Sequence, residues 1–313
     1  MSQINYLPEW PDGKEFAFSI IDDPDSQWLS DSRTVYAFLE DHGFRTTKAI
    51  WPVRRDSDPT AHGETCDNPA YVEFCLALKS KGFELALHNV SYETSSRAET
   101  VRGLDIFRKL IGQDPVVMAN HYNSLEAVYW GSSRLNGLNR LAYNLITGYK
   151  NHHRWHGHEP KHPLFWGDLC KSRIKYVRNF VFHEINTLRA CPFLPYYDPK
   201  RPFVQSWFAG SDGSDVRAAK RLLSPKNLDR LQNEGGLCIL YCHLGHGFVQ
   251  EGHVEREWAK SMERLSKMNG WYVPVGTVLD FIAGRSGIST IDDRQRSRLE
   301  RRWLRQKLWH GTS

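Results

Sequence analysis

The apolar positions in the first part of the chain form short continuous runs, separated by longer stretches with helical spacing. The first run is FAFSII at residues 16–21, and it predicts a buried strand. After it, Val35, Phe38 and Leu39 share one face of a helix that we expect to end near Gly43, where glycine suits a C-cap. Alternation of strand and helix is typical of a parallel sheet.

The same alternation continues up to residue 120. The pattern predicts strands at 47–53, 83–88 and 116–120, and helices at 69–81 and 97–111. Three successive units in this order predict either a βα barrel or a doubly wound sheet.

The second half of the chain is less regular. Residues 145–175 hold five histidines and several aromatic residues without clear periodicity, which indicates a long excursion from the repeating pattern. We expect strands again at 176–185, 203–209 and 236–243, and then a short strand and a helix within 271–283. With no internal repeat and no low-complexity linker, one main domain is favoured.

The charge of the 313-residue chain is concentrated at one end. Residues 285–313 carry eight basic and three acidic side chains, so they hold the whole formal charge of +5 and residues 1–284 are neutral. We therefore interpret 1–284 as the main domain, including the excursion at 145–175, and 285–313 as a basic helix.

Composition excludes several classes of protein. With 40% hydrophobic and 25% charged residues, the chain is typical of a globular protein and unlike a disordered one. No apolar run reaches the roughly 18 residues of a membrane span, and the start lacks the features of a secretory signal, so we expect a cytoplasmic protein. The six cysteines form no C-x2-C pair, which predicts reduced, mostly buried thiols.

Four polar clusters follow predicted strands at their carboxyl ends. They are Asp22 to Asp25, His88 to Tyr92, Asn120 to Asn123, and His243 to His246. Taken singly, an acidic turn or a hydrogen-bonded structural histidine explains each of them. Because the carboxyl ends of parallel strands meet on one rim, the four together favour a site, and Asp23 and His88 could share a divalent metal.

Several segments resemble the polysaccharide deacetylase family (carbohydrate esterase family four, the NodB homology domain). FAFSIIDDPD followed by VYAFLEDHGFRTTKAIW is similar to the opening of that family, and KSKGFELALHNVSY, FRKLIGQDPVVMANHYN and ILYCH are similar to its later motifs. The likeness covers roughly residues 14–125 and 236–283. In length, the chain resembles the WbmS-like subgroup, which is encoded in bacterial O-antigen gene clusters. The resemblance implies a distorted (β/α)7-type barrel.

The resemblance also implies roles for individual residues. Asp22 would be the catalytic base, Asp23 and His88 would be metal ligands, and His243 would be the general acid. The metal would be a divalent ion, and we expect zinc. A backbone N–H near Tyr122 would hold the oxyanion.

Two positions depart from the family pattern: Pro24 stands in place of a glycine, and Tyr92 stands where the second metal histidine is expected. We expect His121 to replace that histidine as the third ligand, with Glu93 as the weaker alternative. Without a third ligand, the chain would be a non-catalytic sugar-binding relative.

Other residues on the expected rim suit a sugar substrate. Arg54 and Arg55 follow the second strand and could bind a phosphate or a sugar carboxylate, although an exposed loop pair is an equal alternative. Trp51 and Trp130 could stack on sugar faces. Together with the resemblance, these residues predict removal of an N-acyl group, acetyl in the first instance, from an amino sugar in bacterial surface-polysaccharide synthesis. The substrate would be nucleotide-linked, lipid-linked or an oligosaccharide; the alternatives are a deformylase or a cyclic-amide hydrolase.

Three features have open interpretations. The histidine run could be a second metal site or a loop over the substrate, but a solvated or aromatic-packed loop is favoured; its members are His152, His153, His156, His158 and His162. His183 and Glu184 point to opposite faces of a strand, so at most one faces a site. The basic helix, with Trp303 and Trp309, could contact anionic lipid at the inner face of the membrane, although it has no single apolar stripe. No nucleic-acid-binding module is recognisable.

Overall fold

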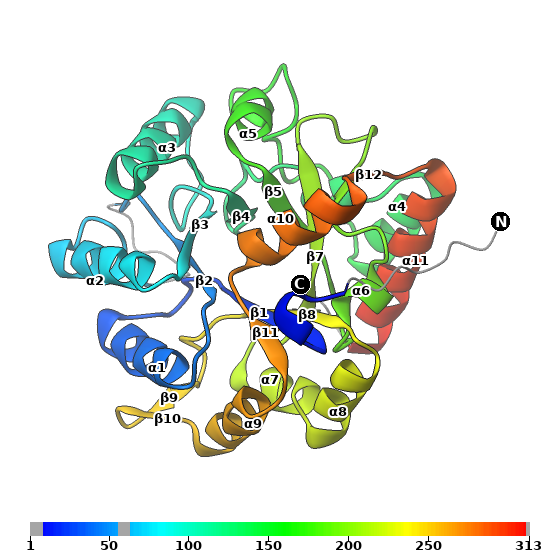
Figure 1. Cartoon of the computed structure of the whole chain (residues 1–313). Helices are drawn as coiled ribbons and strands as arrows, with labels where there is room; N and C mark the ends of the chain where they lie inside the picture. Colours follow the sequence, from blue (N-terminus) through cyan, green and yellow to red (C-terminus); the bar gives the residue numbers. More distant parts are fainter. Residues whose placement is uncertain (1–8, 56–62, 311–313) are drawn as a thin grey trace.

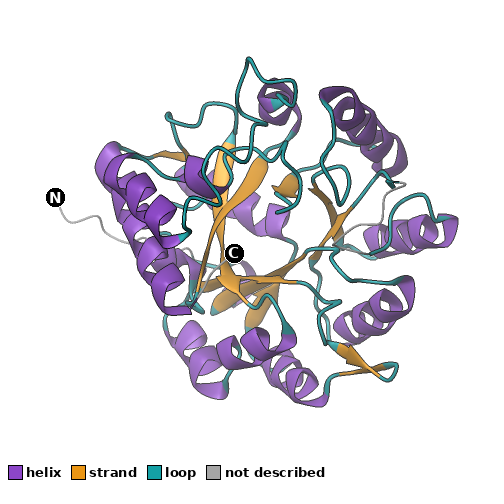
Figure 2. Cartoon of the chain, turned by 180° about the vertical axis from the view of Figure 1, so that it is seen from behind, coloured by secondary structure: helices purple, strands orange, loops and turns teal. Residues whose placement is uncertain are grey.

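The computed structural model describes residues 9–55 and 63–310. At its centre, seven parallel strands form a closed barrel with helices around the outside, as Figure 1 and Figure 2 show from opposite sides. In ring order, the strands are β1 (Phe16–Asp22), β2 (Thr47–Ile50), β3 (Glu84–His88), β4 (Val117–Ala119), β5 (Tyr176–Phe182), β7 (Ser206–Asp212) and β8 (Leu237–Cys242). Strand β8 pairs with β7 and with β1, which closes the ring. The expected distorted (β/α)7-type barrel is confirmed.

The distortion lies beside β1. Only the last two residues of β1 pair with β2, whereas residues 16–18 pair with the short strand β11 (Gly270–Tyr272). Strand β11 therefore takes the place of β2 along the first half of β1. Four other short strands lie outside the ring: β6 (Tyr196–Tyr197), β12 (Ser289–Thr290), and β9 (Val249–Gln250) and β10 (His253–Val254), which form a hairpin.

The helices around the barrel include those expected from the sequence. Helix α3 (Arg97–Ile111) has the predicted bounds, because Ser96 and Glu99 form a capping box at its start and Gly112, at φ +85°, ends it. The other helices of eight or more residues are α1 (Leu29–Asp41), α2 (Pro69–Ser80), α4 (Gly137–Ile146), α8 (Pro225–Asn233), α9 (Arg256–Ser266), α10 (Val275–Ser286) and α11 (Asp293–His310). Shorter ones are α5 (Gly167–Arg173), α6 (Thr187–Ala190), α7 (Val216–Leu222) and the 3-10 turns η1 (Pro11–Gly13) and η2 (Gly131–Arg134).

Some predicted boundaries differ from the structure. The strand expected at 203–209 is β7, shifted to Ser206–Asp212, because its last residues are polar yet buried. One of them, Ser211, shares a hydrogen bond with Thr187 at 2.8 Å. Helices α7, α8 and α9 were not predicted, although α8 and α9 carry buried apolar residues at helical spacing, such as Trp258, Met262 and Leu265 in α9.

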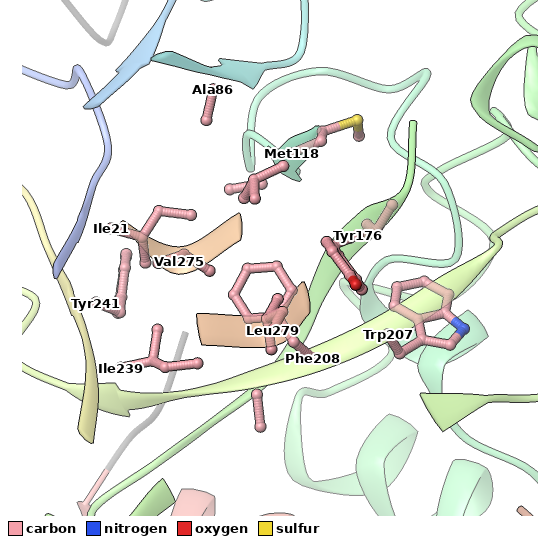
Figure 3. Packing of buried hydrophobic residues seen from close by; sticks show 14 of the residues in the cluster. Ile21, Ala86, Met118, Tyr176, Trp207, Phe208, Ile239, Tyr241, Val275 and Leu279 are labelled. Carbon is pink, nitrogen blue, oxygen red and sulfur yellow. The ribbon is translucent and has the colours of Figure 1, made fainter. Parts of the chain in front are cut away.

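The barrel interior is a packed apolar core. Figure 3 shows Ile21, Ile239 and Phe208, which come from different strands, on the sides of this core, with Val275 and Leu279 of α10 between them. All five side chains are fully buried. A core filled in this way leaves the ends of the strands as the places where a polar site can form.

Helix α10 covers the amino-terminal end of the barrel, in front of the strands in Figure 1. The Val275 N–H donates to Thr47 Oγ1 at 2.8 Å, and the Gly276 N–H donates to Glu84 Oε2 at 3.0 Å. Both acceptors are at the starts of their strands. A polar site must therefore lie at the opposite, carboxyl ends of the strands.

The two peripheral segments pack on this barrel. Within 145–175, helix α5 is the one regular element, and Trp155 and Trp166 are fully buried. The terminal helix begins at Asp293, later than expected, because residues 285 and 286 belong to α10. Trp303 of α11 is buried against Phe180 and Tyr143, with ring centroids 5.4 and 5.6 Å apart.

The cysteines all lie in the described ranges. None of the six is in a disulfide, and five of them are buried, as the sequence predicts; their redox state stays a prediction. Across residues 9–55 and 63–310, no helix combines the length and apolar character needed to cross a bilayer.

Candidate metal and catalytic site

A cavity of about 370 Å³ lies where the barrel strands end. Asp23 and Asp25 follow β1, His88 ends β3, His121 follows β4, and His243 follows β8. All five line the cavity, together with Arg178 of β5. The rim expected from the sequence is therefore real, and it collects residues from five strands of the ring.

Asp25 is the centre of a cluster of histidines. Its Oδ1 is 3.0 Å from His121 Nε2, and its Oδ2 is 3.3 Å from His88 Nε2. The two imidazole rings lie 5.1 Å apart. Burial alone would raise the pKa of Asp25, but hydrogen bonds from His121 and His88 hold it well below the usual range of an aspartate. The carboxylate is therefore ionised at neutral pH.

These residues fit a divalent metal. One donor atom from each of Asp25, His88 and His121 can be chosen so that all three lie within 4.8 Å of one another. His88 Nδ1 is also buried, and no hydrogen-bond partner for it exists in the described ranges. Two imidazoles and one carboxylate are a common set of ligands for zinc and other divalent metals. Asp23, Asp25 and His243 form a second possible group.

Asp23 is held by an arginine. Arg178 donates to both of its carboxylate oxygens, at 2.9 and 2.6 Å, and the two side chains are 3% and 1% exposed. Burial raises the pKa of Asp23, but the charge and hydrogen bonds of Arg178, helped by His88, outweigh burial and lower it. Asp23 is therefore an oriented, ionised carboxylate beside the Asp25 cluster.

His243 has one nitrogen fixed and the other directed to the cavity. Its Nδ1 is 2.8 Å from the Ser214 carbonyl oxygen, which can only accept, so Nδ1 carries the proton of that bond. Its Nε2 is 3.5 Å from Asp25 Oδ2 and 3.2 Å from the Tyr241 hydroxyl. Because Nδ1 keeps its proton, Nε2 can donate a proton only when both ring nitrogens are protonated.

Asp22, the base expected from the resemblance, faces away from this cavity. Its Oδ2 accepts from the Tyr36 hydroxyl at 2.8 Å and lies 3.4 Å from Lys48 Nζ. Its Oδ1 accepts from the Leu244 N–H at 2.9 Å. Successive side chains of an extended chain point to opposite sides, so Asp22 and Asp23 cannot both face the site. The geometry corrects the expectation for Asp22: it anchors the backbone next to His243.

Comparisons with known proteins bear on the fold of this barrel. No protein-family model matches the chain. No curated protein sequence matches it either. Among solved structures, a Mycobacterium smegmatis protein assigned as a polysaccharide deacetylase has a TM-score of 0.50 and 13% identity, covering 91% of this chain and 96% of its own. The chain has the polysaccharide deacetylase fold.

The allantoinase PuuE shares this fold, and the peptidoglycan deacetylase PdaC is a weaker match. The allantoinase PuuE has a TM-score of 0.50 and 11% identity, over 90% of this chain and 95% of its own. The peptidoglycan deacetylase PdaC from Bacillus subtilis has 14% identity and a TM-score of 0.39, over 94% of this chain and 99% of its own. At these identities the likeness concerns the fold, so the chemistry has to be argued from the residues of this chain.

The deacetylase fold here lacks the expected second histidine, and the structure shows what surrounds that position. The Tyr92 hydroxyl bonds to the backbone N–H and carbonyl of Arg55, so it faces away from the Asp25 cluster. His121 lies in the cluster, whereas Glu93 is in neither of the metal groups found within the described ranges. The geometry favours His121 as the third ligand.

The predicted sugar-binding residues divide into two sets. Tyr122 and Trp130 line the cavity. Trp51 is 0% exposed and packs on His121, with ring centroids 5.5 Å apart, so the expectation that it stacks on a sugar is wrong. Arg55 pairs with Glu99, and neither it nor the exposed Arg54 is among the described residues that line the cavity. This placement agrees with the alternative of a loop pair.

The histidine run makes contacts of its own. His156 pairs with Glu159 at 3.0 Å and stacks on His162, with ring centroids 3.9 Å apart. His158 Nδ1 accepts from the Tyr129 N–H at 3.2 Å. None of the five histidines belongs to a metal group found in the described part of the chain. These contacts agree with the interpretation as a packed loop.

His183 and Glu184, which follow the end of β5 at Phe182, also lie outside the cavity. His183 Nε2 is 3.2 Å from Asp212 Oδ2, and Glu184 accepts from Arg230. Neither His183 nor Glu184 is among the described residues that line the cavity. Both belong to local ion pairs.

The sequence interpretation missed two residues of the site. Asp25 was included in the candidate cluster from Asp22 to Asp25 but was given no role, and Arg178 was not singled out. A signal for Arg178 exists, because it interrupts the otherwise apolar strand YVRNFVF and a buried arginine requires a carboxylate partner. For Asp25 the local sequence offers no comparable signal, since Asp after Pro is ordinary in turns.

Proposed function

We propose that this protein is a metal-dependent hydrolase that removes an N-acyl group, acetyl in the first instance, from an amino sugar. The proposal is supported by one observation above all. A single cavity holds a group of two histidines and an aspartate, a second aspartate fixed by an arginine, and a histidine whose Nε2 lies beside Asp25. Amide hydrolysis needs these parts: activation of the carbonyl, a base for water and an acid for the amine.

In this proposal Asp25, His88 and His121 hold the metal. A bound divalent ion polarises the amide carbonyl and makes a water easier to deprotonate; this ligand set favours zinc. The resemblance implied Asp23 as the aspartate ligand of the metal. Asp25 takes that role in this proposal, because Arg178 donates to both carboxylate oxygens of Asp23.

Asp23 then serves as the base. Its lowered pKa keeps it ionised at neutral pH, so it can accept the proton of the attacking water, and Arg178 fixes the direction of its oxygens. The water oxygen forms a bond to the acyl carbon while the carbon–nitrogen bond breaks. His243 Nε2 donates a proton to the departing nitrogen, and the products are a carboxylate and a free amine.

The sugar would lie against the aromatic part of the lining. Tyr122 is 48% exposed, and Trp130 lines the same cavity. Aromatic faces beside polar groups suit a sugar ring, which has an apolar face and a polar edge. A place in surface-polysaccharide synthesis, the WbmS-like subgroup and a cytoplasmic location stay predictions.

The test compares two neighbouring aspartates. Zinc-loaded wild type, Asp23→Asn and Asp22→Asn are assayed for acetate release from a panel of N-acetylated amino sugars. We expect Asp23→Asn to lower kcat by about 10²- to 10⁴-fold, the usual contribution of a general base. Because the substitution leaves the buried Arg178 without its carboxylate, it should also lower the unfolding temperature, so both variants are assayed at a temperature at which they are folded. Asp22→Asn should lower the unfolding temperature and change kcat less than about tenfold.

Two outcomes contradict the proposal. If the wild type releases no acid from any acylated sugar, the sugar-binding alternative takes its place. If Asp22→Asn is the inactive variant and Asp23→Asn is active, the assignment of the base is wrong. Because a solved structure of the same fold is an allantoinase, the panel also contains an N-formyl sugar and a cyclic amide. Turnover of only one of those two would identify a different acyl group or ring opening.

A further inference from the structure

The cavity has a second group of lining residues that the proposed chemistry does not use. These residues come from the segment after β4 and from α11, and they include Trp130, Arg134, Tyr143 and Lys307. Two of the four are cations. The acidic residues of the lining, Asp23 and Asp25, are engaged by Arg178 and by the histidines.

Arg134 is a buried cation without a carboxylate beside it. It is 2% exposed, and its guanidinium carbon lies 4.0 Å from the ring centroid of Trp130 and 4.5 Å from that of Trp303. Its Nε is buried and has no hydrogen-bond partner in the described ranges. Burial, together with the charges of Arg178 and Arg201, outweighs the opposing effect of Tyr143 and lowers the pKa of Arg134 to about 10. The guanidinium nevertheless keeps its charge at neutral pH.

Lys307 brings a second cation to the same cavity. It lies one helical turn after Trp303 on α11, so it shares the face that packs on the barrel. Its Nζ is 5.6 Å from the Trp303 ring and 5.9 Å from the Tyr143 ring. Burial, and then the charge of Arg134, lower the pKa of Lys307 to about 8. Most Lys307 side chains are therefore protonated at pH 7.

Two neighbouring cations in a partly dehydrated cavity raise each other's free energy. An anion that enters the cavity relieves this repulsion and pairs with both charges. A neutral ligand removes water from the cations and gives them no partner, which disfavours its binding. The cavity is therefore electrostatically suited to an anionic ligand.

We propose that Arg134 and Lys307 form a subsite for an anionic group of the substrate, a carboxylate or a phosphate. The proposal rests on the proposed function and makes it more specific: the substrate would be an acidic or phosphorylated N-acyl amino sugar. Lys307, the more accessible of the two, contacts the anion directly. Arg134 is held between the two indoles and supplies a fixed positive charge.

The first experiment measures binding without any reaction. Glucuronic acid, glucose 1-phosphate and glucose are titrated calorimetrically into zinc-loaded wild type, Lys307→Met, Lys307→Arg and Arg305→Met. Arg305 is the matched control, because it is an exposed cation on the outer face of the same helix. Thermal unfolding shows whether each variant is folded.

We expect the wild type to bind at least one anionic sugar about tenfold or more tightly than glucose, since a charged hydrogen bond contributes that much. Lys307→Met should lose this preference, and Lys307→Arg and Arg305→Met should keep it. The tighter of the two anionic sugars identifies the group, carboxylate or phosphate. Equal affinity for the three sugars, or failure to bind either anionic one, overturns the proposal. So does an anion preference that persists in Lys307→Met, because the anion would then be bound elsewhere, at the metal for example.

The second experiment separates this proposal from the proposed function. Acetate release is measured from N-acetylated amino sugars with and without a carboxylate or phosphate. Anion binding that depends on Lys307, with no acetate release from any sugar, refutes the hydrolase and leaves the subsite standing. Acetate release with equal kcat/KM for neutral and anionic sugars overturns the subsite and leaves the hydrolase standing.

Discussion

The ion pair between Arg178 and Asp23 gives the sharpest test of the site's electrostatics. The two side chains share two hydrogen bonds, at 2.9 and 2.6 Å, and are almost completely buried. Replacing Arg178 by methionine removes the positive charge and keeps much of the volume. Asp23 would then be a buried carboxylate that has lost its main partner.

Two arguments give the loss in free energy of unfolding expected for Arg178→Met. Breaking a buried pair by removing one partner costs about 3–5 kcal/mol. An adjacent arginine lowers the pKa of an aspartate by about 1–3 units, and each unit corresponds to about 1.4 kcal/mol, which gives about 1–4 kcal/mol. The ranges overlap, so we expect Arg178→Met to lower the free energy of unfolding by about 3–4 kcal/mol above neutral pH.

The pH dependence has a definite sign. The folded-state pKa of Asp23 is lowered in the wild type, so the stabilisation by the pair is present above the ordinary aspartate pKa and is lost as the pH falls through the folded-state value. In Arg178→Met, burial without the arginine raises the pKa, and the protonated carboxyl is tolerated. The difference between the two proteins should therefore shrink as the pH is lowered.

Urea unfolding between pH 4 and pH 8, with a chelator present so that metal binding does not contribute, measures this difference. Arg97→Met is the matched control, because Arg97 binds Asp168 through two bonds of 2.7 Å while both side chains are more than two-fifths exposed. An exposed pair contributes about 0–1 kcal/mol. Equal losses in the two variants, or a loss in Arg178→Met that does not change with pH, would refute the argument from burial.

Two further predictions concern the histidines and the basic helix. Loss of a residue that only hydrogen-bonds to a metal ligand lowers metal affinity about 10- to 100-fold, so His121→Ala, which removes a ligand, should lower zinc affinity by more than that. His156→Ala, in the packed loop, should bind zinc like the wild type. Metal analysis after dialysis distinguishes the two variants. Equal metal content in both variants would exclude His121 as a ligand. If α11 contacts anionic lipid, replacing three outward cations by glutamine should lower the affinity for phosphatidylserine vesicles about 100-fold, since each cation contributes about 1 kcal/mol to binding. These residues are Arg298, Arg301 and Arg305. Co-sedimentation with the vesicles measures this affinity. Unchanged sedimentation would exclude this contact.

Local sequence patterns were sufficient for much of the barrel. The strand and helix units of the first 120 residues were predicted within a few residues, because each strand is a compact apolar run and each helix has a cap or a glycine at its end. The terminal strand β8 was predicted for the same reason. Helix α8, with two buried leucines three residues apart, was missed because one such pair is too short a signal to distinguish a helix from a loop.

The sequence by itself also determined which rim carries the chemistry, since it put Asp23, His88, His121 and His243 at the carboxyl ends of parallel strands. It did not determine which way each side chain points. The exact direction in which β1 ends decides that Asp22 bonds to Tyr36 and Leu244, while Asp23 faces Arg178 and Asp25 faces the histidines.

The tertiary structure alone decided the partners that are distant in the chain. Arg178 lies 155 residues from Asp23, and Lys307 reaches the cavity only because Trp303 fixes α11 on the barrel. Apolar spacing is a local property that every helix and strand displays in its own sequence, whereas a buried charge is stabilised by whichever opposite charge the fold brings beside it. For this reason the chain's sequence predicted the barrel and its active rim, and the folded structure assigned the roles on that rim.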